Sequence, residues 1–418
     1  MKNKSKDGGV GLYFTLLLWM LLPTVYMTVR TAVAGKTGAN INVFGSIEWF
    51  DLIDESITAF LTVPLYYLLK TKKMRSKYSG FAYVVSMAVY LVFTVVLVFN
   101  MNGIASFMNQ KNAVSYLTAE SVAMLVGFAG TLGILHCILS GRKKVIAGIT
   151  ATKIAGYAIG DVLLVPKFGA VGSAWSDTIV NAMIFAVLAI FVLIPERETF
   201  RFRPDRKFLI EWMKRGLFSG FGIFLDNIVY ALVVVRTISR AGSLGSYWIA
   251  NNIIWGLMIP FISCYCELIK RARIKKLTSK SVYACIAVVF VWIAFVPFWT
   301  PYVRHVLMQS GNDAKNITSL LATLLPFYVA YAASAVIDAS FIAQGRTWCS
   351  AVISVIVNIG YYGIVYLCYR QGTFASSLTQ VAYVFGTGMV IHLVASFIIY
   401  RLLLSHDRKT ELMAEQTA

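Results

Sequence analysis

Twelve apolar runs, each 18 or more residues long, dominate this chain of 418 residues. A helix of about 20 apolar residues crosses the roughly 30 Å hydrocarbon core of a bilayer and satisfies its own backbone hydrogen bonds there. Only 14% of the residues are charged, well below the roughly 25% of a soluble domain. The sequence therefore predicts an all-α polytopic membrane protein. The predicted spans are 11–33, 44–69, 79–100, 115–140, 145–165, 171–194, 216–240, 247–270, 281–303, 317–343, 348–369 and 380–400.

The net charge of +19 is distributed unevenly along the chain. With the N-terminus in the cytoplasm, the inner segments hold 28 of the 38 lysines and arginines, and the outer loops hold six. An excess of cations in short inner loops orients membrane proteins. We therefore expect a multi-pass protein of the cell membrane with both termini in the cytoplasm. Orientation in the lipid bilayer, rather than binding to a nucleic acid, explains the positive net charge of the chain.

The longest inner segment, PERETFRFRPDRKFLIEWMKRG, lies between the sixth and seventh spans. We expect an N-terminal lobe at 1–200, a cytoplasmic linker at 201–215 and a C-terminal lobe at 216–418. The alternating aromatic and basic residues of the segment also suit a position on the anionic inner leaflet of the membrane.

Short internal repeats support this division into halves. VRTAVAGKTG, which starts at Val29, aligns with VRTISRAGSLG, which starts at Val235, so that Arg30 corresponds to Arg236. LSGRKK, from Leu139, aligns with AQGRTW, from Ala343, at nearly the same offset. Two parallel repeats of six helices are typical of secondary transporters that bind their substrate between the repeats.

Several motifs of the chain resemble those of the multidrug and toxic compound extrusion (MATE) transporters, within the multidrug/oligosaccharidyl-lipid/polysaccharide (MOP) flippase superfamily. The first helix of that family typically ends V-D-T-x-x-V-G-R-L-G, which resembles the segment from Val29 to Gly38. FGAVGSA, from Phe168, is similar to a family turn that enters helix six, and Phe224-Leu225-Asp226 is similar to a family F-F-E in helix seven. Gln344-Gly345-Arg346 and Asn358 match features of helices ten and eleven.

The resemblance implies twelve transmembrane helices in two pseudosymmetric six-helix lobes, with a central cleft that opens alternately to each side. It also implies that Asp226 binds the coupling ion, H⁺ or Na⁺. Where many relatives carry an aspartate on helix one, this sequence has Arg30, which argues against an ion site built on that residue.

Charged residues inside a membrane are costly and usually face a cavity or a partner. Asp226 and Asp338 are therefore the candidate ion-coupling residues, although a salt bridge to a helix cation is the structural alternative for Asp226. Candidate residues for the substrate cleft are Asn227, Tyr230, Asn251, Asn252, Arg30 and Arg236. Asparagine side chains in membrane helices also form hydrogen bonds between packed helices.

Arg30 has a candidate partner at the start of the second span. Glu48, Asp51 and Glu55 lie on one helical face, close to Arg30 along the chain. A structural salt bridge, or a gate that forms in one state of the transport cycle, would explain this pairing. Alternatively, Arg30 and Arg236 could bind a carboxylate or phosphate of the substrate.

We therefore expect a secondary active efflux transporter that exchanges a small amphipathic or cationic organic substrate for H⁺ or Na⁺. The alternative is a flippase or exporter of an anionic or lipid-linked metabolite, recognised by Arg30 and Arg236. The four histidines lack metal-ligand spacing, and no phosphate-binding loop or nucleophile motif is present. We thus expect no cofactor, no metal site and no enzymatic activity, and a chain that acts as a monomer. A membrane-embedded transferase is disfavoured by the short outer loops.

Overall fold

The computed structural model describes residues 6–37, 47–107, 111–235, 244–274, 276–307, 311–372 and 377–417, which are helical almost throughout. The chain divides into two compact units, Met1–Gly216 (unit 1) and Leu217–Ala418 (unit 2). Within the described residues, nine helical segments are long and apolar enough to cross a membrane. The chain is therefore a multi-pass membrane protein.

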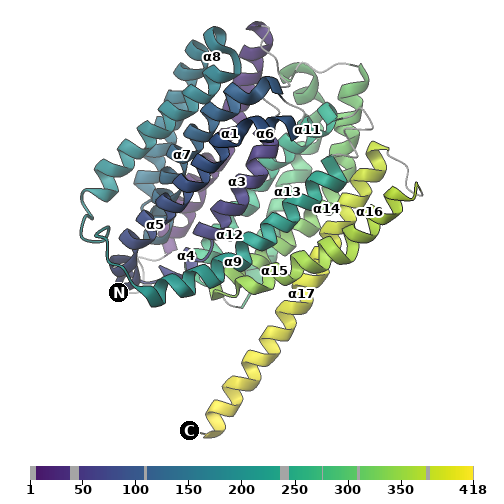
Figure 1. The fold of residues 1–418 in the computed structure, drawn as a ribbon. Helices are drawn as coiled ribbons and strands as arrows, with labels where there is room; N and C mark the ends of the chain where they lie inside the picture. Colours follow the sequence, from purple (N-terminus) through teal and green to yellow (C-terminus); the bar gives the residue numbers. More distant parts are fainter. Residues whose placement is uncertain are drawn as a thin grey trace. The chain divides into compact units, whose positions relative to one another are not determined.

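Unit 1 consists of helices joined by short connections, and α1, α7 and α8 lie side by side in it (Figure 1). Its elements are α1 (Lys6–Thr37), α3 (Ile47–Thr62), α4 (Leu65–Leu68), α5 (Lys72–Phe99), α6 (Met101–Phe107), η1 (Lys111–Ala113), α7 (Val114–Ser140), α8 (Lys143–Leu188), η2 (Ala189–Leu193) and the start of α9 (Arg206–Val229).

Unit 2 is built around α14, which packs against α11, α12, α13 and α17. Its elements after α9 are η3 (Tyr230–Val235), α11 (Leu244–Ile253), η4 (Ile254–Met258), α12 (Ile259–Ala272), α13 (Ser279–Pro301), η5 (Tyr302–Val306), α14 (Gly311–Gln344), α15 (Thr347–Val355), η6 (Ile356–Tyr362), α16 (Gly363–Arg370) and α17 (Leu378–Thr417).

Every predicted span corresponds to helix in the described part of the chain, and the predicted twelve-helix fold is confirmed. The fifth and sixth spans are the two arms of α8, two helices joined by a sharp turn at Gly169. Gly169 has φ +58° and ψ −137°, a conformation that only glycine adopts readily. The turn predicted between these two spans is therefore present, and the spans form the two arms of a hairpin.

The two arms of α8 are in close contact because glycines lie on them at positions that face the opposite arm. A Cβ atom on Gly172 would overlap the carbonyl oxygen of Leu164, and one on Gly160 would overlap Oγ of Ser176. A Cβ on Gly156 would lie 2.7 Å from Val180. Small residues at such positions let the backbones of membrane helices approach each other. The hairpin thus places side chains of the two arms directly opposite each other.

The segment before α9 packs against α5. The ring of Phe202 lies 5.5 Å from that of Phe81, and Phe208 stacks on Tyr78 at 4.3 Å. Trp212 is buried and donates a hydrogen bond of 3.0 Å from Nε1 to the carbonyl of Leu61. The aromatic residues that suggested a position on the inner leaflet therefore contribute to the core of unit 1.

Asp205 caps the N-terminus of α9 by accepting a hydrogen bond of 2.9 Å from the N–H of Phe208. Lys77 of α5 lies 3.2 Å from the same carboxylate. The bond from Phe208, followed by that from Lys77, lowers the pKa of the Asp205 carboxyl below its ordinary value. This partly exposed aspartate ties the start of α9 to α5.

Candidate ion and substrate sites

Arg30, near the end of α1, is buried and bound by both arms of the α8 hairpin. Its Nε and Nη2 donate to Asp161 at 3.0 and 3.1 Å, and its Nη1 and Nη2 donate to Asp177 at 3.0 and 2.8 Å. The glycine-lined contact of the two arms brings the two carboxylates together around one planar guanidinium. Bidentate pairs of this kind are among the strongest charge-assisted hydrogen bonds in proteins.

The structure gives Arg30 partners on α8, whereas the predicted pairing with Glu48, Asp51 and Glu55 of α3 stays a prediction. Glu55 is exposed, and the side chains of Glu48 and Asp51 lie outside the described residues. The guanidinium instead uses four hydrogen bonds on Asp161 and Asp177. Closeness along the chain favoured α3 in the prediction, whereas helix packing places α8 against α1. Arg236, the repeat partner of Arg30, lies outside the described residues.

Lys153, also on α8, is a second cation near this network. Its Nζ lies 4.5 Å from the centre of the Trp19 ring and 5.8 Å from that of Tyr157, and Asp177 acts on it electrostatically. Cations above aromatic faces are attracted by the ring quadrupole. Two carboxylates and two cations are thus grouped where α1 meets the hairpin.

Unit 1 also contains a cavity of about 290 Å³ next to Lys153. Asp54 of α3 faces it and accepts hydrogen bonds from the hydroxyls of Tyr90 and Thr58. The ring of Tyr90 stacks on Phe128 at 4.1 Å. The cavity is lined by Trp19, Asp54, Thr58, Tyr90, Met124, Gly127, Phe128, Gly130, Thr131, Ile134, Lys153, Asn181 and Ile184.

In unit 2, Asp226 of α9 is hydrogen-bonded to α15 and η6. Its Oδ2 accepts from the Ser354 hydroxyl at 3.0 Å, and its Oδ1 accepts from the Asn358 amide at 2.5 Å. Asn358 is itself buried and also donates to the carbonyl of Ser354 at 2.8 Å. Both partners come from an apolar stretch of sequence, and both hold the carboxylate without a formal positive charge.

Asp338 of α14 forms the second acidic centre of unit 2. Its Oδ2 lies 2.8 Å from Nε2 of His392, and its Oδ1 accepts a hydrogen bond of 3.0 Å from Ser396, both on α17. Asp338 and His392 both act electrostatically on Asp226. We call Asp226, Asp338 and His392, with Ser354, Asn358 and Ser396, the unit 2 acidic cluster.

The other residues predicted for the cleft lie elsewhere in unit 2. Tyr230 donates a hydrogen bond of 3.2 Å to the hydroxyl of Tyr247. Asn227 is half-buried beside Asp226, Asn251 is half-buried on α11, and Asn252 is exposed there. In the part of the chain that the structure describes, neither Asn251 nor Asn252 bonds to Asp226. The structure therefore brings Asp226 close to Asp338 but not to these two amides.

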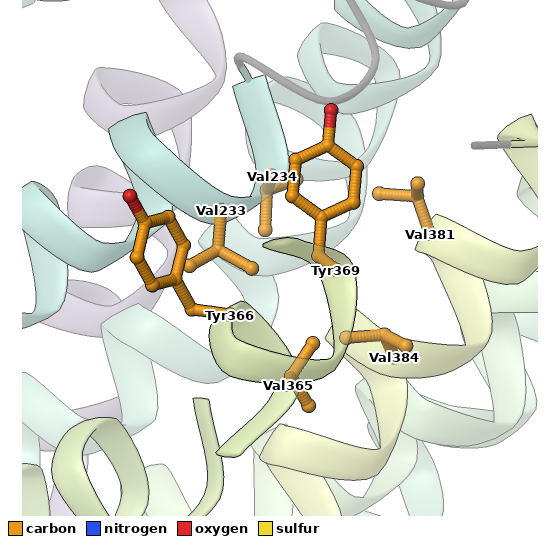
Figure 2. Close-up of a pocket in the computed structure, with 7 residues that line it drawn as sticks. All are labelled: Val233, Val234, Val365, Tyr366, Tyr369, Val381 and Val384. Atoms are coloured by element: carbon orange, nitrogen blue, oxygen red, sulfur yellow. The ribbon is translucent and has the colours of Figure 1, made fainter. Parts of the chain in front are cut away.

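A small apolar pocket of about 10 Å³ lies between η3, α16 and α17. Figure 2 shows valine side chains around it and the tyrosine hydroxyls directed away from the valines. A pocket of this size has room for about one water molecule, and its lining offers no polar recognition group. It is therefore no candidate for substrate binding. Its lining residues are Val233, Val234, Val365, Tyr366, Tyr369, Val381 and Val384.

Comparison with solved structures identifies the fold of this chain. No family model and no curated protein sequence matches the chain. Solved structures do match it along nearly its whole length. A MATE transporter in complex with MaL6 is similar with a TM-score of 0.77, 16% sequence identity and 97% coverage of both chains. An outward-facing multidrug resistance MATE family transporter of the MOP superfamily is similar with a TM-score of 0.74, 16% identity and 98% coverage of both chains.

The chain has the fold of the MATE transporters. A MOP superfamily transporter from Pyrococcus furiosus Vc1 shares this fold with a TM-score of 0.73, 17% identity and 96% coverage of both chains. That protein is described as having a binding pocket of reverse polarity that suggests a different function.

Five charged or titratable residues of these sites were given no role by the sequence analysis: Asp54, Lys153, Asp161, Asp177 and His392. His392 was dismissed because the histidines lack metal-ligand spacing, Asp54 was not singled out from its acidic neighbours, and Lys153 received no role. The spacing of Gly156, Gly160 and Gly172 was the available signal for a tight hairpin that brings Asp161 and Asp177 together. No comparable signal in the sequence connects His392 with Asp338.

Proposed function

We propose that this chain is a secondary active transporter that exports a small amphipathic or cationic organic substrate in exchange for protons. The protons bind in the unit 2 acidic cluster, at Asp226, Asp338 and His392. The observation that carries the proposal is the pairing of His392 with Asp338, inside two membrane-spanning helices and within electrostatic reach of Asp226. Ionisable groups inside a membrane are costly, and they usually mark ion or proton pathways.

The hydrogen bonds of the acidic cluster favour a proton over a sodium ion. Each of the four carboxylate oxygens of Asp226 and Asp338 already interacts with a protein donor. A sodium ion would have to displace several of these donors to gain oxygen ligands. A proton needs one position, and histidine is the side chain whose charge changes near neutral pH.

Proton binding can be coupled to movement because the cluster joins separate helices. Asp226 on α9 is bonded to α15 and η6, and Asp338 on α14 is bonded to α17. Protonation of a carboxylate weakens the bonds that it accepts and thereby changes the relative stability of two helix arrangements. A ligand that binds one arrangement better shifts the population toward it, which is the requirement for alternating access.

An exporter of anions that recognises them through Arg30 is not favoured. The Arg30 guanidinium already binds two carboxylates, so an incoming anion would have to displace buried ion pairs. The orientation is part of the proposal: the cation bias of the loops supports a protein of the cell membrane with both termini in the cytoplasm. We also propose that the chain acts as a monomer.

The test is transport in proteoliposomes with pH and sodium gradients set independently. With ethidium as the transported probe, we expect a pH gradient alone to drive transport and a sodium gradient alone to be without effect. Asp226→Asn and Asp338→Asn should each slow proton-driven transport at least about tenfold, a change equal to 1.4 kcal/mol in the barrier. Ser340→Ala on α14 is the matched control, because within the described residues the Ser340 hydroxyl bonds to its own helix, at the carbonyl of Ile337.

Sodium-driven transport by the wild-type chain would contradict proton coupling. If Asp226→Asn carried out proton-driven transport at the wild-type rate, Asp226 would not be a residue that binds the coupling proton. Both results are read against the amount of protein reconstituted, which is measured for each variant.

A further inference from the structure

Two cations of unit 1 lie on the ring of one tyrosine, where α4 meets the start of α9. Nζ of Lys70 lies 4.3 Å from the centre of the Tyr67 ring, and Cζ of Arg215 lies 4.5 Å from the same point. The two charges are therefore no further apart than the sum of these distances. One phosphate group, with charge-assisted hydrogen bonds of about 2.7–2.9 Å on either side, can contact both cations.

The position of Arg215 is fixed by its own helix and by α3. A Cβ atom on Gly216 would lie 2.5 Å from the carbonyl oxygen of Phe60, so α9 approaches α3 closely at this point. Within α9, Nε of Arg215 donates a hydrogen bond of 2.6 Å to Glu211. Guanidinium and ammonium are thus held on the Tyr67 ring by residues of two separate elements.

Cations greatly outnumber acids in the two segments that meet here. Residues 65–77 contain five lysines and arginines and no aspartate or glutamate. Residues 210–216 contain Lys214, Arg215 and one acid, Glu211. Of these cations, Lys72, Lys73 and Lys214 are exposed. A surplus of this size attracts anions and repels cations.

The outward face of α9 beside this pair is apolar. Ile210, Met213 and Leu217 are exposed, and their spacing places them on one side of the helix. Because α9 belongs to a segment long and apolar enough to cross a membrane, this side faces acyl chains. Lys214 is exposed on the same side, where its hydrocarbon stem can lie along lipid while its ammonium stays at the headgroups. The cations therefore lie where the acyl chains of the bilayer meet its headgroups.

From these observations we infer that Tyr67, Lys70 and Arg215 form a binding site for the phosphate of an anionic phospholipid, with Lys214 at its edge. The phosphate oxygens accept hydrogen bonds from Lys70 and Arg215, and the acyl chains lie along the apolar side of α9. A soluble phosphate could reach the same cations, but it would leave that apolar side without a partner. A bound lipid joins α4 to α9 and strengthens the attachment of α9 to unit 1. The inference is independent of the proposed transport.

The experiment is lipid binding to the purified full-length chain in detergent, followed by native mass spectrometry, with dioleoyl phosphatidylglycerol as the probe. We expect the first molecule of this lipid to bind at least about tenfold more tightly than dioleoyl phosphatidylcholine, whose ammonium the surplus of cations repels, a difference of 1.4 kcal/mol. The double variant Lys70→Gln/Arg215→Gln should weaken that binding by a similar factor. Lys280→Gln is the matched control, because it removes an exposed cation at the start of α13, on the predicted inner side.

Three results would overturn the inference. Equal binding of the two lipids would do so without any variant, and this comparison holds even if the double variant folds poorly. Equal weakening by Lys280→Gln and by the double variant would show a general attraction to the basic inner surface instead of a site. Displacement of the lipid by an equal concentration of glycerophosphoglycerol, its soluble headgroup, would assign the cations to soluble phosphates. Arg215→Lys, which keeps the charge, should retain more binding than Arg215→Gln.

Discussion

Arg30 binds Asp177 through two parallel hydrogen bonds of 3.0 and 2.8 Å, from Nη1 and Nη2 to the two carboxylate oxygens. Asp161 binds the same guanidinium from the other arm of the hairpin. One arginine on α1 therefore holds the two arms of α8 together. Without it, two neighbouring carboxylates would lie inside the membrane with no counter-ion from Arg30.

Replacement of Arg30 should destabilise unit 1 strongly. Arg30→Met leaves two buried carboxylates without their counter-ion, and breaking a buried pair in this way costs about 3–5 kcal/mol. We expect a loss of that size in the free energy of unfolding, measured by denaturant titration in mixed micelles. The triple variant with Asp161→Asn and Asp177→Asn should recover part of the loss. An Arg30→Met chain as stable as the wild type would contradict the bridging role.

Substitution of a glycine in the α8 hairpin should also destabilise unit 1, though by less than loss of Arg30. A Cβ on Gly172 would overlap the backbone carbonyl of Leu164, so Gly172→Ala must separate the two arms. We expect it to lower the free energy of unfolding by about 1–3 kcal/mol, as for other overpacked sites. Gly148→Ala in the same helix is the matched control, because a Cβ there meets nothing within 4 Å. It should be neutral or stabilising by up to about 1 kcal/mol.

Most of the fold could be predicted from the sequence because length and apolarity alone decide where a helix crosses a bilayer. The predicted spans therefore match the described helices from α1 to α17, and the turn predicted between the fifth and sixth spans lies at Gly169 of α8. Asp226 could be predicted as a buried acid from its depth in a span and from the family resemblance.

The partners of these acids could not be predicted in the same way. Arg30 and Asp177 are 147 residues apart in the chain, and Asp338 and His392 are 54 apart. The apolar pattern of a membrane helix indicates its length, but it does not indicate which neighbour each face contacts. The nearer acids Glu48, Asp51 and Glu55 were therefore preferred for Arg30. A lone histidine in an apolar helix gave no indication that it faces Asp338.

Asp205 should make the attachment of α9 dependent on pH. Its pKa lies below the ordinary value because Phe208 N–H and Lys77 bond to the ionised form. The stabilisation is therefore present above the ordinary carboxyl pKa of about 3.9 and is lost as the pH falls through the lower pKa of the folded state. The difference in unfolding free energy between wild type and Asp205→Ala, measured from neutral to acidic pH, should decline at the acidic end.

The matched variant Asp205→Asn keeps an oxygen that can accept from Phe208 but removes the charge that Lys77 contacts. It should be intermediate in stability and should not titrate. A difference between wild type and Asp205→Ala that stays constant across the whole pH range would show that the carboxylate form has no special role.

His392 should set the pH range in which the proposed transport works. The imidazole beside Asp338 is a group of the cluster that can bind and release a proton. His392→Gln keeps a side chain that can donate to Asp338 but removes the imidazole as a group that binds protons. We therefore expect proton-driven transport at pH 7 to slow at least about tenfold and the dependence of its rate on pH to change. His406→Gln is the control, because that side chain is 77% exposed at the end of α17. Proton-driven transport with an unchanged pH profile in His392→Gln would assign His392 to packing alone and leave proton binding to Asp226 and Asp338.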